Sequence, residues 1–136
     1  MKKIAMAMFL LVFLFALSGC SVVLGVDKSA MIKAPSNTMS KEQVERIWEK
    51  SIELGRAYGY EVKQEDKARH YLLMEKVFFN KGFRQISVQI GNFNNFGVGV
   101  EVFGRVTHPD DDIVTSGVSA DVNIIKSAVE KILNES

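Results

Sequence analysis

Cysteine, histidine and proline are scarce in this chain. Its 136 residues include one cysteine, two histidines and two prolines. A single cysteine cannot form a disulfide within the chain, so packing must hold any folded domain together. The chain also contains no Gly-x-Ser-x-Gly, Gly-x-Gly-x-x-Gly or P-loop sequence. The motifs that would indicate a serine hydrolase or a nucleotide-binding site are therefore missing.

The chain has one long hydrophobic run, and it lies at the N-terminus. Residues 4–17 are all apolar, follow two lysines and number 14. A membrane-spanning helix needs about 20 such residues. A short positive segment followed by an apolar run of this length is typical of a secretory signal peptide. The run closes with Leu17-Ser18-Gly19-Cys20.

This tetrapeptide resembles the lipobox of bacterial lipoproteins, and the resemblance covers residues 1–20 only. It implies that a diacylglycerol is attached to the Cys20 thiol, that a dedicated peptidase removes residues 1–19, and that fatty acids such as palmitate hold the chain to a membrane. Two or three acyl chains on one residue give a durable attachment. By resemblance to enteric sorting rules, Ser21 indicates the outer membrane, facing the periplasm, where the organism has one. An ordinary secretory signal and an uncleaved anchor are the alternatives.

The processed chain is long enough for one domain and a tether. Cleavage before Cys20 removes 19 of 136 residues and leaves 117. Residues 20–37 are predicted to be a membrane tether and residues 38–136 a small domain; whether residues 22–26 add an edge strand stays open. Without two of its 17 Lys+Arg, the chain has 15 basic and 16 acidic residues. Near-neutrality without a basic run excludes nucleic acid as the expected partner, and also binding to anionic lipid through a basic patch.

The first helix is the best-specified element of the predicted domain. Ser40 and Gln43 have the spacing of a capping box, and Gly59 suits the left-handed position that ends a helix. The apolar stripe of this helix, at helical spacing, consists of Val44, Ile47, Trp48, Ile52 and Tyr58. Ser51 and Gly55 fall in the same stripe, and their small size would let the helix backbone approach the surface on which it packs.

After Gly59 the hydrophobic period changes to two, which predicts strands. The segments expected to form strands are residues 60–64, 69–79, 84–90 and 98–106. Residues 113–118 are ambiguous. A last helix is predicted from Ser119, as its cap, to about Asn134. The order α-β-β-β-β-α predicts an α+β fold of two layers: a four-stranded antiparallel meander with the N- and C-terminal helices on one face.

Three groups of residues resemble a metal, catalytic or phosphate-binding site, and each has a simpler structural explanation. His108 with Asp110, Asp111 and Asp112 resembles a metal-ligand set, but it lacks the ligand count of a defined site. His70 lies in the predicted strand 69–79, without a nucleophile. Four glycines invite a phosphate-loop interpretation, but their spacing fits neither known motif and favours turns and close strand contacts: Gly91, Gly97, Gly99 and Gly104. We therefore predict no catalytic residue, metal or cofactor.

Several apolar side chains do not belong to the predicted core. If Val100 and Val102 face the helices, Phe103 must point to the other side of the sheet, because side chains alternate along a strand. Apolar groups on an uncovered face can mark a partner site. The residues assigned to this surface are Leu73, Val77, Phe93, Phe96 and Phe103. The alternatives are that the tether covers this face or that the face is simply patchy, since scattered surface aromatics are normal.

The function expected from the sequence is that of a lipid-anchored, non-enzymatic module of the bacterial cell envelope, which binds another envelope component. The alternative is a lipoprotein that binds a small ligand or lipid in a cavity between helices and sheet. The mixture of large and small residues along the first helix (Trp48 and Tyr58 beside Ser51 and Gly55) is compatible with such a cavity and with ordinary interdigitation.

The anchor assignment generates the first testable prediction. Cys20→Ala should abolish both lipidation and cleavage by the lipoprotein peptidase, because the thiol is the acylation site in the class that the chain resembles. Metabolic labelling with a fatty-acid analogue, followed by gel mobility, measures both effects. Continued labelling of the Cys20→Ala chain would refute the assignment.

Overall fold

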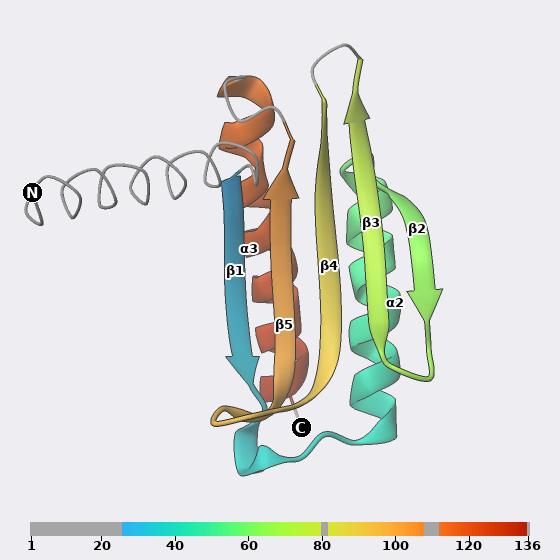
Figure 1. The fold of residues 1–136 in the computed structure, drawn as a ribbon. Coiled ribbons are helices and arrows are strands. Elements are labelled where there is room, and N and C mark those ends of the chain that lie inside the picture. Colours follow the sequence, from blue (N-terminus) through green and yellow to red (C-terminus); the bar gives the residue numbers. More distant parts are fainter. Residues whose placement is uncertain (1–25, 80–81, 108–111, 136) are drawn as a thin grey trace, which may run out of the picture.

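The computed structural model describes residues 26–79, 82–107 and 112–135, which form an α+β fold with two helices and a five-stranded antiparallel sheet (Figure 1). The strand order is β1-β5-β4-β3-β2. In chain order the elements are β1 (Val26–Lys33), the 3-10 turn η1 (Pro35–Asn37), α2 (Lys41–Ala57), β2 (Glu61–Asp66), β3 (Tyr71–Phe78), β4 (Gly82–Phe93), β5 (Gly97–Val106) and α3 (Asp112–Asn134).

The sheet has a fifth strand within the segment predicted as tether, where the sequence left open only an edge strand at residues 22–26. β1 pairs antiparallel with β5, from Val26 opposite Val106 to Lys33 opposite Gly99. Ile32 is 6% exposed, so the strand contributes to the core. The prediction of four strands was therefore wrong, and the described part of segment 20–37 belongs to the fold. Its partner strand comes about seventy residues later in the chain, a distance over which hydrophobic period carries no signal.

Helix α2 confirms the local prediction. The Gln43 backbone N–H donates to the Ser40 hydroxyl at 3.1 Å, and the Ser40 N–H donates to the Gln43 side-chain oxygen at 2.9 Å. These two bonds satisfy donors that the first turn of a helix leaves unpaired. The helix ends before Gly59, whose φ of 89° is the left-handed conformation that glycine adopts without strain.

Helix α3 begins seven residues before the predicted cap Ser119, and the ambiguous residues 113–118 lie within it. Packing explains the difference. Val118 is fully buried, and a Cβ on Gly104 of β5 would come within 2.7 Å of the Val118 and Val122 methyl groups. The bare backbone of Gly104 thus lets the first half of α3 rest directly on β5. Such tertiary contacts override the weak helix propensity of a segment rich in β-branched residues and glycine.

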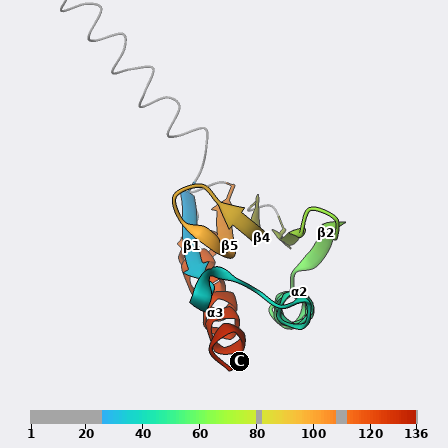
Figure 2. The same ribbon diagram turned by 90° about the horizontal axis from the view of Figure 1, so that it is seen from below.

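Both helices lie on the same side of the sheet, which gives the molecule two layers (Figure 2). The pleat of each strand sends alternate side chains toward the helices. The core that results is apolar and consists mainly of Ile32, Ile47, Trp48, Leu72, Met74, Ile86, Val88, Ile90, Val100, Val102, Val106, Val118, Val122, Ile125, Val129, Ile132 and Leu133.

Gly55 of α2 faces the Met74 side chain of β3. A Cβ built on Gly55 would overlap the sulfur of Met74, a fully buried β3 side chain. Ser51, one turn earlier, is also buried, and its hydroxyl donates to the Ile47 carbonyl at 2.7 Å. The two small residues therefore place the helix backbone against the sheet.

The substitution Gly55→Ala should lower the stability of the domain. Mid-helix alanine is intrinsically better than glycine by about 1 kcal/mol, but overpacking a tight core costs about 1–3 kcal/mol, so we expect a net loss. Gly55→Leu should cost more. Urea melts of residues 21–136 measure the effect.

The matched control is Gly91→Ala, because no atom lies within 4 Å of the position that its Cβ would take. Its midpoint should stay unchanged or rise slightly. Combining Gly55→Ala with Met74→Val should recover part of the loss, since the second change removes the overlapping sulfur. A raised midpoint for Gly55→Ala alone would contradict this packing.

Candidate functional site

Both helices pack on one face of the sheet, and in the described part of the chain neither packs on the opposite face. We call this opposite face the outer face. An antiparallel sheet commonly leaves one face in water. Here that face mixes polar and apolar groups rather than being uniformly hydrophilic. By strand register and alternation, its central residues are Tyr71, Leu73, Glu75, Gln85, Ser87, Gln89, Glu101, Phe103 and Arg105.

A hollow of about 240 Å³ lies in the middle of the outer face. Leu73, Ser87 and Phe103 stand opposite one another on β3, β4 and β5 and form one row across it. Ser87 is small and sits between two larger side chains, which creates the depression. We call this feature the outer-face hollow. Its lining residues are Tyr71, Leu73, Gln85, Ser87, Phe103 and Arg105.

Contacts with neighbouring side chains orient the polar groups around the outer-face hollow. The Arg105 guanidinium carbon lies 5.8 Å from the centre of the Phe103 ring, within range of a cation–π contact. The Gln85 side-chain nitrogen donates to the Glu75 carboxylate at 3.0 Å. The hollow thus presents apolar surface flanked by oriented hydrogen-bonding groups. It can receive an apolar or aromatic side chain, but its lining includes no histidine, cysteine or carboxylate.

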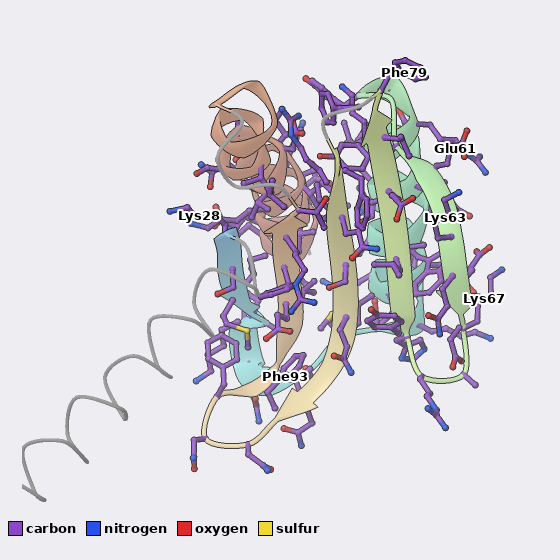
Figure 3. The ribbon with its side chains drawn as sticks, turned by 45° about the horizontal axis from the view of Figure 1, so that its top comes forward. Lys28, Glu61, Lys63, Lys67, Phe79 and Phe93 are labelled. Atoms are coloured by element: carbon purple, nitrogen blue, oxygen red, sulfur yellow. The ribbon has the colours of Figure 1, made fainter. Side chains whose placement is uncertain are left out.

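The structure brings together only part of the predicted partner surface. Leu73 and Phe103 line the outer-face hollow, whereas Val77 lies farther along β3 and is 68% exposed. Phe93 ends β4, and Phe96 follows in the turn to β5, so both lie at the opposite end of the sheet, where Figure 3 labels Phe93. The sequence analysis missed Tyr71, Gln85, Ser87 and Arg105. The alternation in 84–90 and 98–106 does predict that Gln85, Ser87 and Arg105 share a face with Phe103. The predicted partner surface included apolar residues only.

Most of the candidate residues for lipidation and metal binding lie outside the part of the chain that the structure describes. Cys20, His108, Asp110 and Asp111 lie outside the described residues, and Asp112 opens α3. Among the residues that are described, no group of three histidine, cysteine or acidic side chains is placed to hold a metal. In the same residues, no helix is long and apolar enough to cross a membrane.

The sequence predicted that His70 lies in a strand. This was wrong, since β3 begins one residue later, at Tyr71. The φ of His70, 52°, is left-handed, as befits the last residue of the β2–β3 turn, and its carbonyl accepts a hydrogen bond from the Ile90 N–H at 3.0 Å. The exposed side chain borders an open groove of about 370 Å³ at the start of α2. Trp48 lines this groove too, and its indole N–H donates to Glu65 at 2.8 Å.

A buried polar network that the sequence analysis did not identify joins the sheet to α3. Arg84 of β4 is 6% exposed, and its guanidinium donates to the Asp121 carboxylate of α3 at 3.0 Å. The Tyr60 hydroxyl donates to the same carboxylate oxygen at 2.6 Å. Gly117 makes room for the guanidinium, which also lies 4.5 Å from the centre of the Phe78 ring. A sequence signal existed, since Arg84 shares the parity of Ile86, Val88 and Ile90.

The surroundings of this network indicate a structural role. The adjoining cavity, lined by Tyr60 and Asp121 among others, has about 10 Å³, roughly the space of one water. Burial, and then the hydrogen bond to Asp121, raise the pKa of Tyr60 above its ordinary range. A substrate has no room to reach these groups. Removing one partner of a buried ion pair costs about 3–5 kcal/mol, so the network fixes α3 on the sheet.

Comparisons with known proteins identify no family. No known family and no curated protein matches this chain. Among solved structures, CalU16 from Micromonospora echinospora is similar over 80% of this chain and 81% of its own, with a TM-score of 0.44 and 10% identity. The Zhui aromatase/cyclase from Streptomyces sp. R1128 is similar over 81% of this chain and 91% of its own, with a TM-score of 0.30 and 12% identity.

Tyr60→Phe should destabilise the domain at neutral pH, because it removes a hydrogen bond to a buried carboxylate, worth about 1.5–3 kcal/mol. The difference from the unchanged protein should shrink at high pH. A raised folded-state pKa means that the phenol stabilises the fold fully below its unfolded pKa of about 10, and that this contribution is lost as pH rises above it.

Urea melts between about pH 8 and pH 11.5 measure this dependence. Tyr58→Phe is the matched control, since Tyr58 is 45% exposed and lies outside the network. It should leave stability nearly unchanged throughout. A Tyr60→Phe deficit that stayed constant up to the alkaline limit would contradict the network as described.

Proposed function

We propose that this chain is a lipid-anchored, non-enzymatic module of the bacterial cell envelope that binds another envelope protein through its outer-face hollow. The observation that carries the proposal is a hollowed sheet face, uncovered in the described structure, in which Tyr71, Phe103 and Arg105 converge. Tyrosine and arginine are enriched among the residues that dominate binding energy at protein interfaces, and phenylalanine is enriched at interfaces in general.

The anchor rests on the lipobox ending in Cys20. Acylation there would place the processed chain at a membrane surface, and Ser21 favours the outer membrane in an organism that has one. Confinement to a membrane raises the effective concentration of the domain for any partner in the same layer. A modest interface is then sufficient, which accords with a hollow of about 240 Å³.

The size of the spaces favours a protein partner over a small ligand. Small-molecule sites usually measure about 300–1,000 Å³ and enclose most of the ligand. The outer-face hollow is smaller and open, and the groove of about 370 Å³ beside Trp48 reaches this size but is also open, so it would not enclose most of a ligand. The alternative of a lipid-binding cavity between helices and sheet would need far more room than the 10 Å³ beside Tyr60 and Ile86. A balance of 15 basic and 16 acidic residues after processing gives no reason to expect nucleic acid.

Site-specific photo-crosslinking in living cells tests this function. A photoreactive phenylalanine analogue in place of Phe103 should capture one defined envelope protein, identified by mass spectrometry. The same analogue in place of Ser127, an exposed α3 residue in the other layer, should not capture it. Equal capture from both positions would refute a specific outer-face contact, and lipid that co-purified with the domain would favour the alternative.

Affinity for the captured protein gives the quantitative test. Truncating a central interface residue typically costs about 2 kcal/mol or more, roughly a thirtyfold rise in Kd. Phe103→Ala should therefore weaken binding by that order, whereas Ser127→Ala should not change it. Because Phe103 is only partly buried, the melting temperature should change little.

A further inference from the structure

Three of the four exposed large apolar side chains among the described residues lie at one end of β3, and the fourth, Met31, lies on β1. Phe79, directly after the strand, is 88% exposed, and Val77 is 68% exposed. Tyr58, at the end of α2, is 45% exposed. A scattered apolar residue on a surface is ordinary, but a phenylalanine almost wholly in water at the tip of a hairpin is not required by the fold. Phe79 belongs neither to the core nor to the lining of the outer-face hollow.

The chain reaches the domain at this same end. β1 begins at Val26, and only residues 21–25 separate it from Cys20. An extended chain spans at most about 3.6 Å per residue, so Val26 lies within roughly 22 Å of the acylated residue. A tether this short holds one particular end of the domain toward the membrane.

Strand register shows how Phe79 lies relative to that end. Val26 stands opposite Val106, Val106 opposite Arg84, and Arg84 opposite Lys76. Phe79 comes three residues beyond this row, about 10 Å farther along the strand direction. Figure 1 shows the start of β1 and the end of β3 at the same end of the sheet, and Figure 3 shows Phe79 there, opposite Phe93 and Lys67.

We propose that this end of the domain rests on the lipid bilayer and that Phe79 inserts between the lipid headgroups, with Val77 beside it. The proposal rests on the Cys20 anchor proposed above, because the anchor and its short tether bring the bilayer within reach. A single phenylalanine would bind a membrane weakly by itself. Tethered within a few nanometres of the lipid, it works at high effective concentration and needs only to orient a domain that is already attached.

The described residues near this end carry charges of both signs, with Lys76 next to Val77 and Arg56 in the last turn of α2. Glu61 and Lys63 on the neighbouring strand form an ion pair at 3.5 Å and offset each other. Processing also leaves the chain with 15 basic and 16 acidic residues. If Phe79 inserts as an apolar group, the contact persists at high salt and in vesicles without anionic lipid, since screening weakens only charge-based attachment.

The contact would also orient the outer-face hollow. Leu73 of β3 lies six residues before Phe79, which places the hollow about 20 Å from the tip. With the strands upright on the membrane, the hollow opens sideways at that height. It would then face a neighbouring protein in the envelope rather than the lipid.

A fluorescent reporter in the full-length, lipidated protein tests the contact. Acylation consumes the Cys20 thiol, so an introduced cysteine is the only free thiol of the chain. Val77→Cys and Lys67→Cys, at opposite ends of the sheet, are each labelled with an environment-sensitive maleimide dye. The proteins are then reconstituted into vesicles of phosphatidylethanolamine, with and without phosphatidylglycerol. We expect the dye at position 77 to be several-fold less quenched by iodide than the dye at position 67, and to be quenched by lipids with brominated acyl chains.

A second variant isolates Phe79. In the Val77→Cys protein, Phe79→Ser should raise iodide quenching to near the level at position 67, with acylation unchanged. Equal quenching at positions 77 and 67 in acylated protein would overturn the membrane contact and leave the anchor standing. If iodide quenching at position 77 fell as the protein density in the vesicles rose, a second copy of the chain would be covering Phe79. That result would also overturn the membrane contact. Mass spectrometry of the N-terminal peptide tests the anchor separately, and an unacylated Cys20 would refute both proposals.

Discussion

The alternation of side chains along β4 and β5 is the constraint on which the rest of this structure depends. One parity places Val88 and Val102 against the helices, and the other places Ser87 and Phe103 on the opposite side. A shift of register by one residue would exchange the two sets and expose the core. Because both helices take the same side, the same alternation that builds the core also builds the outer-face hollow.

Arg84 is the exception to that alternation, and its setting explains how the fold tolerates it. It occupies a core position of β4, yet Asp121 neutralises its charge and Phe78 lies against its guanidinium. The cost of desolvating two charges is offset only where geometry and further hydrogen bonds are good, and the Tyr60 hydroxyl supplies one more. Tyr60 from the connection between α2 and β2, Arg84 from β4 and Asp121 from α3 therefore meet at a single point. This restricts how α3 can slide along the sheet, which apolar contacts alone would restrict less.

The short stretch of chain between Cys20 and β1 would link the proposed anchor to the fold. Had the domain begun at residue 38, a flexible segment of some eighteen residues would have let it turn freely at the membrane. With β1 as the edge strand beside β5, only residues 21–25 separate Cys20 from the sheet in the sequence. The two proposed contacts, Phe79 with lipid and the outer-face hollow with a protein, then lie on one rigid body in a defined relation.

The sequence by itself determined those features that depend on neighbours a few residues away. The capping box of α2, its end at Gly59 and the alternation in β4 and β5 were predicted because hydrogen bonds and side-chain periods of this kind act within a turn or along one strand. The tertiary structure alone decided what depends on distant pairings. It made β1 part of the sheet, extended α3 back to Asp112 over the bare backbone of Gly104, brought Arg84 to Asp121, and set Leu73 across from Phe103 with Ser87 between them. The physical reason is the same in each case: these contacts join segments far apart in the chain, and their free energy comes from burial that no single segment can accomplish alone.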